Sequence, residues 1–256
     1  MRIAIITGAS SGMGMEFAKT IEKRFSGIEE FWLIARRKDR LTELAKCMKR
    51  PCKILALDLS YEEEIKKLNS LLVKENPDVK ILINSAGFGR YDRFTKISRR
   101  DNADMIKVNC LALTDVTYAV LPYMRKGSLL IQFASSAAFL PQPKFAVYAA
   151  TKSYVLSFTR ALKCECRQKG IRMTAVCPGP VDTEFFGLAE EKHDVMWYKK
   201  LIMADCSKVV NLALKDALAN KDVSVYGLPI KAFRVLAKVL PHALLLNIVE
   251  VLNDKS

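Results

Sequence analysis

The stretch Thr7-Gly8-Ala9-Ser10-Ser11-Gly12-Met13-Gly14 decides the fold. It follows an apolar run, Arg2–Thr7, and it precedes apolar residues at helical spacing between Phe17 and Phe25. Glycines at such a turn let the chain reverse tightly and let a pyrophosphate approach the backbone N–H groups, while the helix N-terminus adds partial positive charge. Its place at the first strand-to-helix turn predicts a dinucleotide site. The alternative is a glycine-rich turn that binds no ligand.

Strand-like and helical patterns alternate along the chain. Most of the strand-like runs are continuously apolar, as expected for strands covered on both faces. The runs are Arg2–Thr7, Glu30–Ala35, Lys53–Leu57, Lys80–Asn84, Ser128–Ala134, Arg172–Cys177 and Val223–Tyr226. We therefore expect a single α/β domain over residues 1–256: a doubly wound (Rossmann) parallel sheet of about seven strands, with helices on both faces in three layers. Such sheets bind ligands at the carboxyl ends of their strands.

Three helices can be placed between these strands. Ser60 and Glu63 have the spacing of a capping box, which predicts a helix over Tyr61–Glu75. Two longer patterns, Met105–Met124 and Val147–Lys169, are largely apolar on one face.

The chain is basic, because 41 Lys and Arg residues against 27 Asp and Glu residues give a formal net charge of +14. Such a balance suits nucleic acid, an anionic membrane surface or anionic small molecules. Acidic residues interleave with the basic ones, however, and no aromatic-basic repeat or nucleic-acid-binding module is recognisable. We therefore expect a solvated basic surface and no nucleic-acid partner.

Cysteine and histidine usage limits the chemistry further. The seven cysteines include no C-x-x-C pair, and the two histidines, His193 and His242, lie far apart. This composition predicts no disulfide framework, no metal site and a reducing, cytoplasmic environment. We expect no signal peptide, and we expect no transmembrane segment because polar residues and Pro241 interrupt the apolar stretch Val235–Leu252.

The second strand ends in Ala35-Arg36-Arg37-Lys38. A site for NAD usually has an acidic residue here, which binds the ribose 2′-hydroxyl, whereas arginine suits a 2′-phosphate. Arg36 and Arg37 therefore predict NADP(H) rather than NAD(H). The alternative is that they are ordinary surface cations of a basic protein.

Several polar residues have the chemistry of an acid/base site. Tyr148 and Lys152 lie four residues apart, which places both on one face of a helix. Free tyrosine, with a pKa of about 10, is a poor base at neutral pH, but a neighbouring ammonium lowers that pKa. Ser135 and Ser136 follow the fifth strand, where a hydroxyl can donate to a substrate oxygen. Asn109 lies within a long helical pattern although asparagine is a poor helix former.

Taken in order, these motifs resemble the short-chain dehydrogenase/reductase family, from Arg2 to about Phe186. The matching segments are Thr7–Gly14, Asp58, Asn84–Gly87, Asn109, Ser135, Tyr148 with Lys152, and Pro178–Thr183. The resemblance implies an oxidoreductase that interconverts a secondary alcohol and a ketone by hydride transfer with a nicotinamide cofactor.

The resemblance also implies roles for individual residues. Tyr148 would be the general acid/base, and the family's spacing selects Ser135 rather than Ser136 to hold the substrate oxygen. Lys152 would hold the nicotinamide ribose and lower the Tyr148 pKa, and Asn109 would place a water that relays protons through Lys152. The implied cofactor-binding residues are Gly8, Ser10, Ser11, Gly12, Met13, Gly14, Arg36, Arg37, Asp58, Leu59, Asn84, Ala86, Gly87, Tyr148, Lys152, Pro178, Gly179, Val181 and Thr183.

Substrate selectivity in this family is set after Thr183, so we expect residues 184–210 to form a substrate lid. Its aromatic and methionine residues, in Phe185–Phe186 and Met196–Tyr198, suit a bulky apolar substrate such as a hydroxysteroid, a bile acid or a 3-ketoacyl compound. The alternative is ordinary packing of a helical lid. The alternative function is a non-catalytic NADP-sensing or scaffold protein on the same fold, although the complete motif set favours an enzyme.

Residues 229–256 predict a helical C-terminal extension. Apolar residues recur at helical spacing from Ile230, basic residues lie between them, and Pro241 interrupts the pattern. The favoured interpretation is an amphipathic helix pair that covers the substrate cleft or packs on a second subunit, and the alternative is a basic helix on an anionic membrane. The long patterns Met105–Met124 and Val147–Lys169 resemble the helices with which this family forms dimers and tetramers, so we expect a homodimer or homotetramer.

Overall fold

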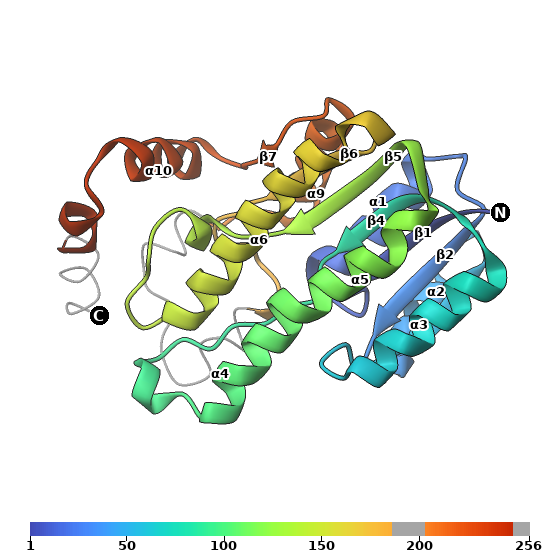
Figure 1. Ribbon diagram of the computed structural model, residues 1–256, viewed down its shortest axis with the longest axis horizontal. Coiled ribbons are helices and arrows are strands. Elements are labelled where there is room, and N and C mark those ends of the chain that lie inside the picture. The colour runs from blue at the N-terminus through green and yellow to red at the C-terminus, as the bar shows by residue number, and fades with distance from the viewer. Residues whose placement is uncertain (186–202, 248–256) are drawn as a thin grey trace.

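The computed structural model describes residues 1–185 and 203–247 (Figure 1). Within these residues, seven parallel strands form one sheet in the order β3-β2-β1-β4-β5-β6-β7. The strands are β1 (Arg2–Thr7), β2 (Glu30–Ala35), β3 (Cys52–Ala56), β4 (Asp78–Asn84), β5 (Met124–Phe133), β6 (Arg172–Val176) and β7 (Val223–Ser224). This is the doubly wound α/β sheet that the sequence predicts, and its strand order reverses between β1 and β4.

Helices cover both faces of this sheet. The α-helices that lie wholly among the described residues are α1 (Gly12–Arg24), α2 (Lys38–Lys46), α3 (Glu62–Glu75), α4 (Arg99–Ile106), α5 (Leu113–Val120), α6 (Ala146–Glu165), α9 (Cys206–Leu218) and α10 (Leu228–Val239), of which α10 lies beyond the sheet (Figure 1). Side chains from α1, α2 and α9 pack on one face, and side chains from α3 and α5 pack on the other. Because successive residues of a strand point to opposite faces, each central strand supplies both layers of the core. In β1, Ile6 belongs to the first layer and Ile5 to the second.

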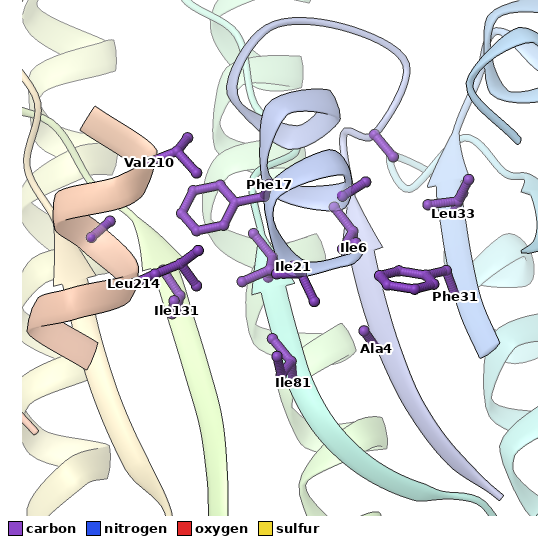
Figure 2. Close-up of a cluster of buried hydrophobic side chains, with 14 of the residues drawn as sticks. Ala4, Ile6, Phe17, Ile21, Phe31, Leu33, Ile81, Ile131, Val210 and Leu214 are labelled. Atoms are coloured by element: carbon purple, nitrogen blue, oxygen red, sulfur yellow. The ribbon is translucent and has the colours of Figure 1, made fainter. Parts of the chain in front are cut away.

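The core under α1 and α9 is built around Phe17. Its ring lies edge-on to that of Phe133 at the end of β5, with centroids 5.4 Å apart. Figure 2 shows Phe17 between α1 and α9, directed toward Val210 and Leu214. The side chain has no exposed surface. Its contacts connect the first helix with the fifth strand and with α9, a helix distant in sequence.

The boundaries of the long helical patterns differ from the prediction. The pattern predicted over Met105–Met124 begins earlier, at Arg99, and consists of α4, a π-helical segment (Lys107–Ala112) and α5. It ends before Met124, which already belongs to β5, because Pro122 lies in a short 3₁₀ turn over Leu121–Tyr123. Helix α6 ends at Glu165, and a separate 3₁₀ turn covers Arg167–Lys169.

The predicted capping box at Ser60 is wrong. Helix α3 has Tyr61 as its N-cap residue, without a side-chain capping bond. The Ser60 hydroxyl instead donates to Asp58 Oδ1 at 2.7 Å, and the Ser60 N–H donates to the same oxygen at 3.0 Å. Serine favours such local bonds to a neighbouring carboxylate in a turn, which competes with capping. The first turn of α3 is stabilised by its run of glutamates at residues 62–64 instead.

The last five residues of the predicted lid segment, residues 184–210, belong to a core helix and not to a lid. Residues 206–210 form the first turns of α9, where Val209 and Val210 are buried in the core under the sheet. Residues 186–202, which include Met196–Tyr198, lie outside the described residues. At the C-terminus, residues 242–247 are helical and follow α10, so the chain does form a helix pair around Pro241. Residues 248–256 lie outside the described part.

Truncation of Phe17 tests the described core. We expect Phe17→Ala to lower the free energy of unfolding by about 3–5 kcal/mol, because it removes a fully buried ring and leaves a cavity. The matched control is Phe94→Ala, whose ring is 62% exposed, and its effect should stay within about 0.5 kcal/mol. Urea denaturation followed by circular dichroism measures both, and equal losses would contradict the packing described here.

Candidate active site

A cavity of about 1270 Å³ runs along the carboxyl ends of the central strands. Its lining comes from the loops that follow β1 to β6 and from α10. The predicted cofactor residues that line it are Gly8, Ser10, Ser11, Gly12, Met13, Arg36, Arg37, Asp58, Leu59, Ala86, Gly87, Tyr148, Lys152, Pro178, Gly179, Val181 and Thr183. Segments far apart in sequence thus meet where the strand order reverses, the usual ligand site of such sheets.

Two of the predicted cofactor residues lie behind this lining. A side chain at Gly14 would overlap the Gly8 carbonyl oxygen, so this glycine lets α1 pack directly on the turn that follows β1. The Asn84 amide is buried, and it donates to Thr117 Oγ1 at 2.9 Å and to Gln132 Oε1 at 3.2 Å. Gly14 and Asn84 therefore position the turn and the strand next to the cavity and do not line it themselves.

Thr7 holds the two central strands together next to the cavity. Its hydroxyl oxygen accepts hydrogen bonds from the N–H groups of Ser85 and Ala86, both at 3.1 Å. Thr7 is the first residue of the glycine motif, yet the sequence does not reveal that its hydroxyl fixes the loop after β4. The pairing of β1 with β4 supplies that information.

Tyr148 and Ser135 form the polar centre of the cavity. Tyr148 lies in the first turn of α6 and stacks on Phe145, with ring centroids 4.2 Å apart. Ser135 precedes a 3₁₀ turn, its oxygen accepts a bond from the Ala137 N–H at 3.1 Å, and its side chain is hydrogen-bonded with that of Tyr148. The neighbouring Ser136 also lines the cavity, and its N–H donates to the Pro178 carbonyl at 2.8 Å.

Burial governs the ionisation of Tyr148. It raises the pKa of the Tyr148 hydroxyl well above its usual value, and the hydrogen bond with Ser135 offsets this only in part. The sequence predicts the opposite direction, because it places an ammonium beside the phenol. Lys152 Nζ lies 5.6 Å from the Tyr148 ring centroid and donates to the Phe133 carbonyl at 2.8 Å. In this arrangement desolvation is the largest influence on the phenol, so Tyr148 carries its proton at neutral pH.

Lys152 is itself a buried ammonium. Its residue is 5% exposed, and burial lowers its pKa to about 8. Gly87 permits the close approach of the loop after β4, because a Cβ there would lie 2.8 Å from Asn109 Oδ1 and 3.4 Å from Lys152 Nζ.

Asn109 lies in the π-helical segment between α4 and α5, where it is fully buried. Its Nδ2 donates to the Phe88 carbonyl at 2.9 Å and to Thr151 Oγ1 at 3.0 Å, and its Oδ1 accepts from the Phe88 N–H at 3.0 Å. The amide therefore fastens the loop after β4 to α6. The extra residue of a π-helical turn, a feature often found at functional sites, turns Asn109 inward. Thr151, which sequence reasoning did not single out, completes this contact.

Arg37 connects the end of β2 to the glycine-rich turn. Its guanidinium donates to Ser11 Oγ at 2.6 Å and to Ser10 Oγ at 3.2 Å, and it forms an ion pair with Glu184 at 2.9 Å. Arg40, one turn further along α2, also binds Glu184, so two guanidinium groups share one carboxylate and hold its pKa below the usual range. The sequence did not point to Arg40 or Glu184, because their contact spans distant parts of the chain. Arg36 lines the same end of the cavity and is exposed.

Helix α10 closes the opposite end of the cavity. Pro229, Ile230, Phe233 and Leu236 line it, together with Leu245 from the next helical segment. Of the predicted C-terminal extension, the described residues therefore supply part of the cavity wall. Among residues 1–185 and 203–247, no cluster of three or more potential metal ligands occurs, and no helix is sufficiently long and apolar to cross a bilayer.

Comparison with known proteins identifies the family. The family model described as short chain dehydrogenase matches residues 2–194. An uncharacterized oxidoreductase of Staphylococcus epidermidis is 32% identical over 184 residues, which cover 71% of this chain and 79% of the relative. A very-long-chain 3-oxoacyl-CoA reductase of Pyrenophora tritici-repentis is 30% identical over 216 residues, 80% of this chain and 62% of the relative. The chain belongs to the short-chain dehydrogenase/reductase family and is an oxidoreductase of that family.

A solved structure extends the likeness to most of the chain. The short-chain dehydrogenase from Sphingobium yanoikuyae, in complex with NADPH, superimposes with a TM-score of 0.79 at 26% sequence identity. The similarity covers 95% of this chain and 98% of the other. The fold predicted from the sequence is therefore confirmed both by the strand order and by this likeness.

The pKa of Lys152 can be tested through protein stability. Between about pH 8 and about pH 10.4 the unfolded chain binds the Lys152 proton and the folded protein does not. Stability from this residue therefore rises with pH in that window. We expect the free energy of unfolding of the wild type, relative to Lys152→Met, to rise by about 1 kcal/mol between about pH 7.5 and about pH 9.

Urea denaturation of both proteins at the two pH values measures this change. Groups that do not interact with Lys152 cancel in the comparison. Parallel pH profiles would show that Lys152 does not titrate in this window.

Proposed function

We propose that the protein is an NADP(H)-dependent oxidoreductase that interconverts a secondary alcohol and a ketone. The observation that carries this proposal is the placement of the half-buried Ser135 with the buried Tyr148 and Lys152 in the lining of one cavity, whose other end carries Arg36 and Arg37. A non-catalytic NADP-sensing protein has no need of an ionisable phenol buried beside a hydroxyl and an ammonium. We therefore favour the enzyme over a sensor or scaffold on the same fold.

The cavity suits a dinucleotide. The glycine-rich turn carries no side chain at Gly8 or Gly12 on the path between the arginines and Tyr148, and Gly87 keeps the loop after β4 equally bare. Arg36 and Arg37 would hold the 2′-phosphate, the start of α1 would bind the pyrophosphate, and Pro178–Thr183 would hold the nicotinamide end. When bound, the cofactor supplies or accepts the hydride.

The protein's own residues handle the proton. Tyr148 keeps its proton at neutral pH, so it can donate this proton to the carbonyl oxygen while the carbonyl carbon is reduced. Ser135, which is hydrogen-bonded with Tyr148, would hold the same oxygen. In oxidation the phenol must give up its own proton first, and the positive charge of Lys152 then favours the phenolate. Asn109 would act by fixing the loop that faces Lys152, and we keep its water-relay role as part of the proposal.

We propose a bulky apolar substrate, such as a hydroxysteroid, a bile acid or a 3-ketoacyl compound. Phe145, Phe185 and α10 give the substrate end of the cavity apolar walls, which supports this class. The 3-oxoacyl-CoA reductase among the relatives supports an acyl thioester. A screen of hydroxysteroids and 3-ketoacyl thioesters with both cofactors, read by absorbance of the reduced nicotinamide, tests the choice.

We also propose a cytoplasmic homodimer or homotetramer. All seven cysteines are free, which suits a reducing compartment. Exposed apolar side chains on the paired long helices, including Leu111, Tyr118 and Tyr154, support an interface between subunits.

Removal of the Tyr148 hydroxyl tests the mechanism. Tyr148→Phe keeps the stacked ring and removes only the acid, so we expect turnover to fall by at least about a hundredfold while cofactor binding persists. Steady-state kinetics and cofactor fluorescence titration measure the two effects. Retention of more than about a tenth of the wild-type turnover would refute the acid/base role.

Two serines provide the matched comparison. Ser135→Ala should reduce turnover strongly, because it removes the hydroxyl bonded with Tyr148. Ser136→Ala should reduce turnover much less, because the structural bond of Ser136 comes from its backbone N–H. Equal losses would contradict the assignment of Ser135.

Cofactor preference tests the arginines. A charge-assisted contact contributes about 1.5–3 kcal/mol, so Arg37→Gln should weaken NADPH binding about ten- to a hundredfold and leave NADH binding nearly unchanged. Arg36→Gln shows whether the neighbouring arginine shares this role. An unchanged ratio of NADPH to NADH affinity in both variants would exclude the proposed 2′-phosphate site.

Glu184 offers a second test of the same site. Its carboxylate binds Arg37, one of the two arginines that the 2′-phosphate would need, so Glu184→Gln should strengthen NADPH binding about three- to tenfold, as expected for the loss of an exposed ion pair. The control is Glu43→Gln on α2, which removes the same charge from an exposed residue. Equal effects of the two variants would indicate general electrostatics instead of competition at the site.

A further inference from the structure

Helix α10 has a second apolar face, which the cavity does not use. Ile230, Phe233 and Ala237 face the protein, where they are buried or line the cavity. Leu228 and Val239, by contrast, are 79% and 74% exposed, and Val235 between them is 59% exposed. Leu228, Val235 and Val239 are spaced by seven and four residues, so they form one strip along the outer side of the helix.

The charges beside this strip all have one sign. From Leu228 to Asn247 the chain contains no Asp or Glu residue, and it carries Lys231, Arg234 and Lys238. Lys231 and Lys238 are exposed, and helical spacing places both along one edge of the apolar strip. Arg234 is directed inward, with its guanidinium 5.9 Å from the centre of the Phe139 ring. In Figure 1, α10 lies at one end of the molecule, beyond the arrowhead of β5.

We propose that the outer face of α10 docks on an anionic lipid bilayer. A helix of this kind lies in the plane of the membrane, with its apolar strip among the acyl chains and its lysines at the headgroups. The strip of Leu228, Val235 and Val239 supplies the apolar contact, and Lys231 and Lys238 supply the charge complementary to anionic headgroups. The net charge of +14 adds attraction at longer range.

The same charges disfavour a second copy of the chain as the partner of this face. A twofold interface brings the same patch of both subunits together. Two copies of α10 would then gather four lysines at one interface, and the segment Leu228–Asn247 holds no carboxylate to pair with them. An anionic bilayer offers acyl chains to the apolar strip and negative headgroups to the lysines.

Docking here would place the lipid next to the apolar end of the cavity. Phe233 and Leu236 line the cavity from the same helix whose outer side carries the strip. Ile230 seats the helix on the loop after β6, since a Cβ at Gly179 would lie 2.6 Å from Ile230 Cδ1. An apolar substrate dissolved in the bilayer would therefore meet the cavity wall first. Only this delivery step rests on the proposed function, and the docking itself does not.

Co-sedimentation of the full chain with vesicles tests the docking. We expect the protein to sediment with phosphatidylglycerol/phosphatidylcholine vesicles and not with vesicles of phosphatidylcholine alone. Each lysine near an anionic surface is worth about a fivefold change in partition coefficient, so Lys231→Gln with Lys238→Gln should weaken binding about 25-fold. The control is Lys66→Gln with Lys67→Gln on α3, which removes the same charge from exposed lysines elsewhere and should have little effect.

A valine pair tests the apolar contact. Val239→Gln should weaken vesicle binding severalfold, whereas Val73→Gln, at a 64% exposed valine of α3, should not. Both positions are exposed, and circular dichroism confirms that the variants are folded. The experiment needs no turnover, so its result is independent of the proposed reaction.

Three outcomes would overturn the docking proposal. The first is absence of sedimentation with anionic vesicles. The second is equal loss of binding in the α3 and α10 variants. The third is a light-scattering mass that falls in Val239→Gln without any vesicle binding by the wild type, which would assign the strip to a second copy of the chain.

Discussion

The contact between the carboxyl ends of β1 and β4 holds the site together. Thr7 lies opposite Asn84 in the register of these strands, and its hydroxyl accepts two backbone N–H groups from the loop after β4. Gly8 approaches that loop so closely that a Cβ would lie 2.8 Å from the Ala86 nitrogen. The chain segments that follow β1 and β4 lead to opposite faces of the sheet, and the cavity opens between them. The cavity therefore depends on the contact between these two strand ends.

The second constraint is the burial of charge at the other end of the cavity. An ammonium is costly to remove from water, and Lys152 has one strong acceptor within reach, the Phe133 carbonyl. Loss of solvation disfavours the charged form of each group, so it lowers the pKa of Lys152 and raises the pKa of Tyr148. A protein built only for stability would fill these positions with apolar side chains, so the presence of both groups at the cavity supports the proposed function.

Much of the fold follows from the sequence, because continuous apolar runs and the glycine motif specify buried parallel strands. The bounds of β1 and β2 were predicted to the residue, and those of β3 and β6 to within one residue. Errors arose where local patterns compete. Ser60 bonds to Asp58 instead of capping α3, and a proline and a π-helical segment divide the long helix predicted over Met105–Met124.

The sequence predicted which residues lie at the candidate site, but it did not predict the contacts between them. Motif order identified the residues that line the cavity, but the Tyr148 pKa depends on desolvation, which spacing along a helix does not contain. The contact between Arg37 and Glu184 likewise joins positions 147 residues apart. Asn84 was expected to bind the cofactor and Asn109 to place a water, and motif order could not reveal the buried bonds that the amide nitrogen of each residue donates, from Asn84 to Thr117 and from Asn109 to Phe88.

Helix α10 shows how the same sequence pattern can serve two environments. Its pattern is amphipathic, yet the side that faces the protein and the side that faces outward are both apolar in part, with lysines on one flank. A helix that only closed a cavity would carry a polar outer side, because exposed leucine and valine gain nothing from water. A helix that only bound a membrane would not need Ile230 and Phe233 against the cavity. Helix α10, which has twelve residues, carries an apolar side toward the cavity and another toward the outside. The best explanation is that this helix separates an apolar cavity from an apolar medium outside the protein.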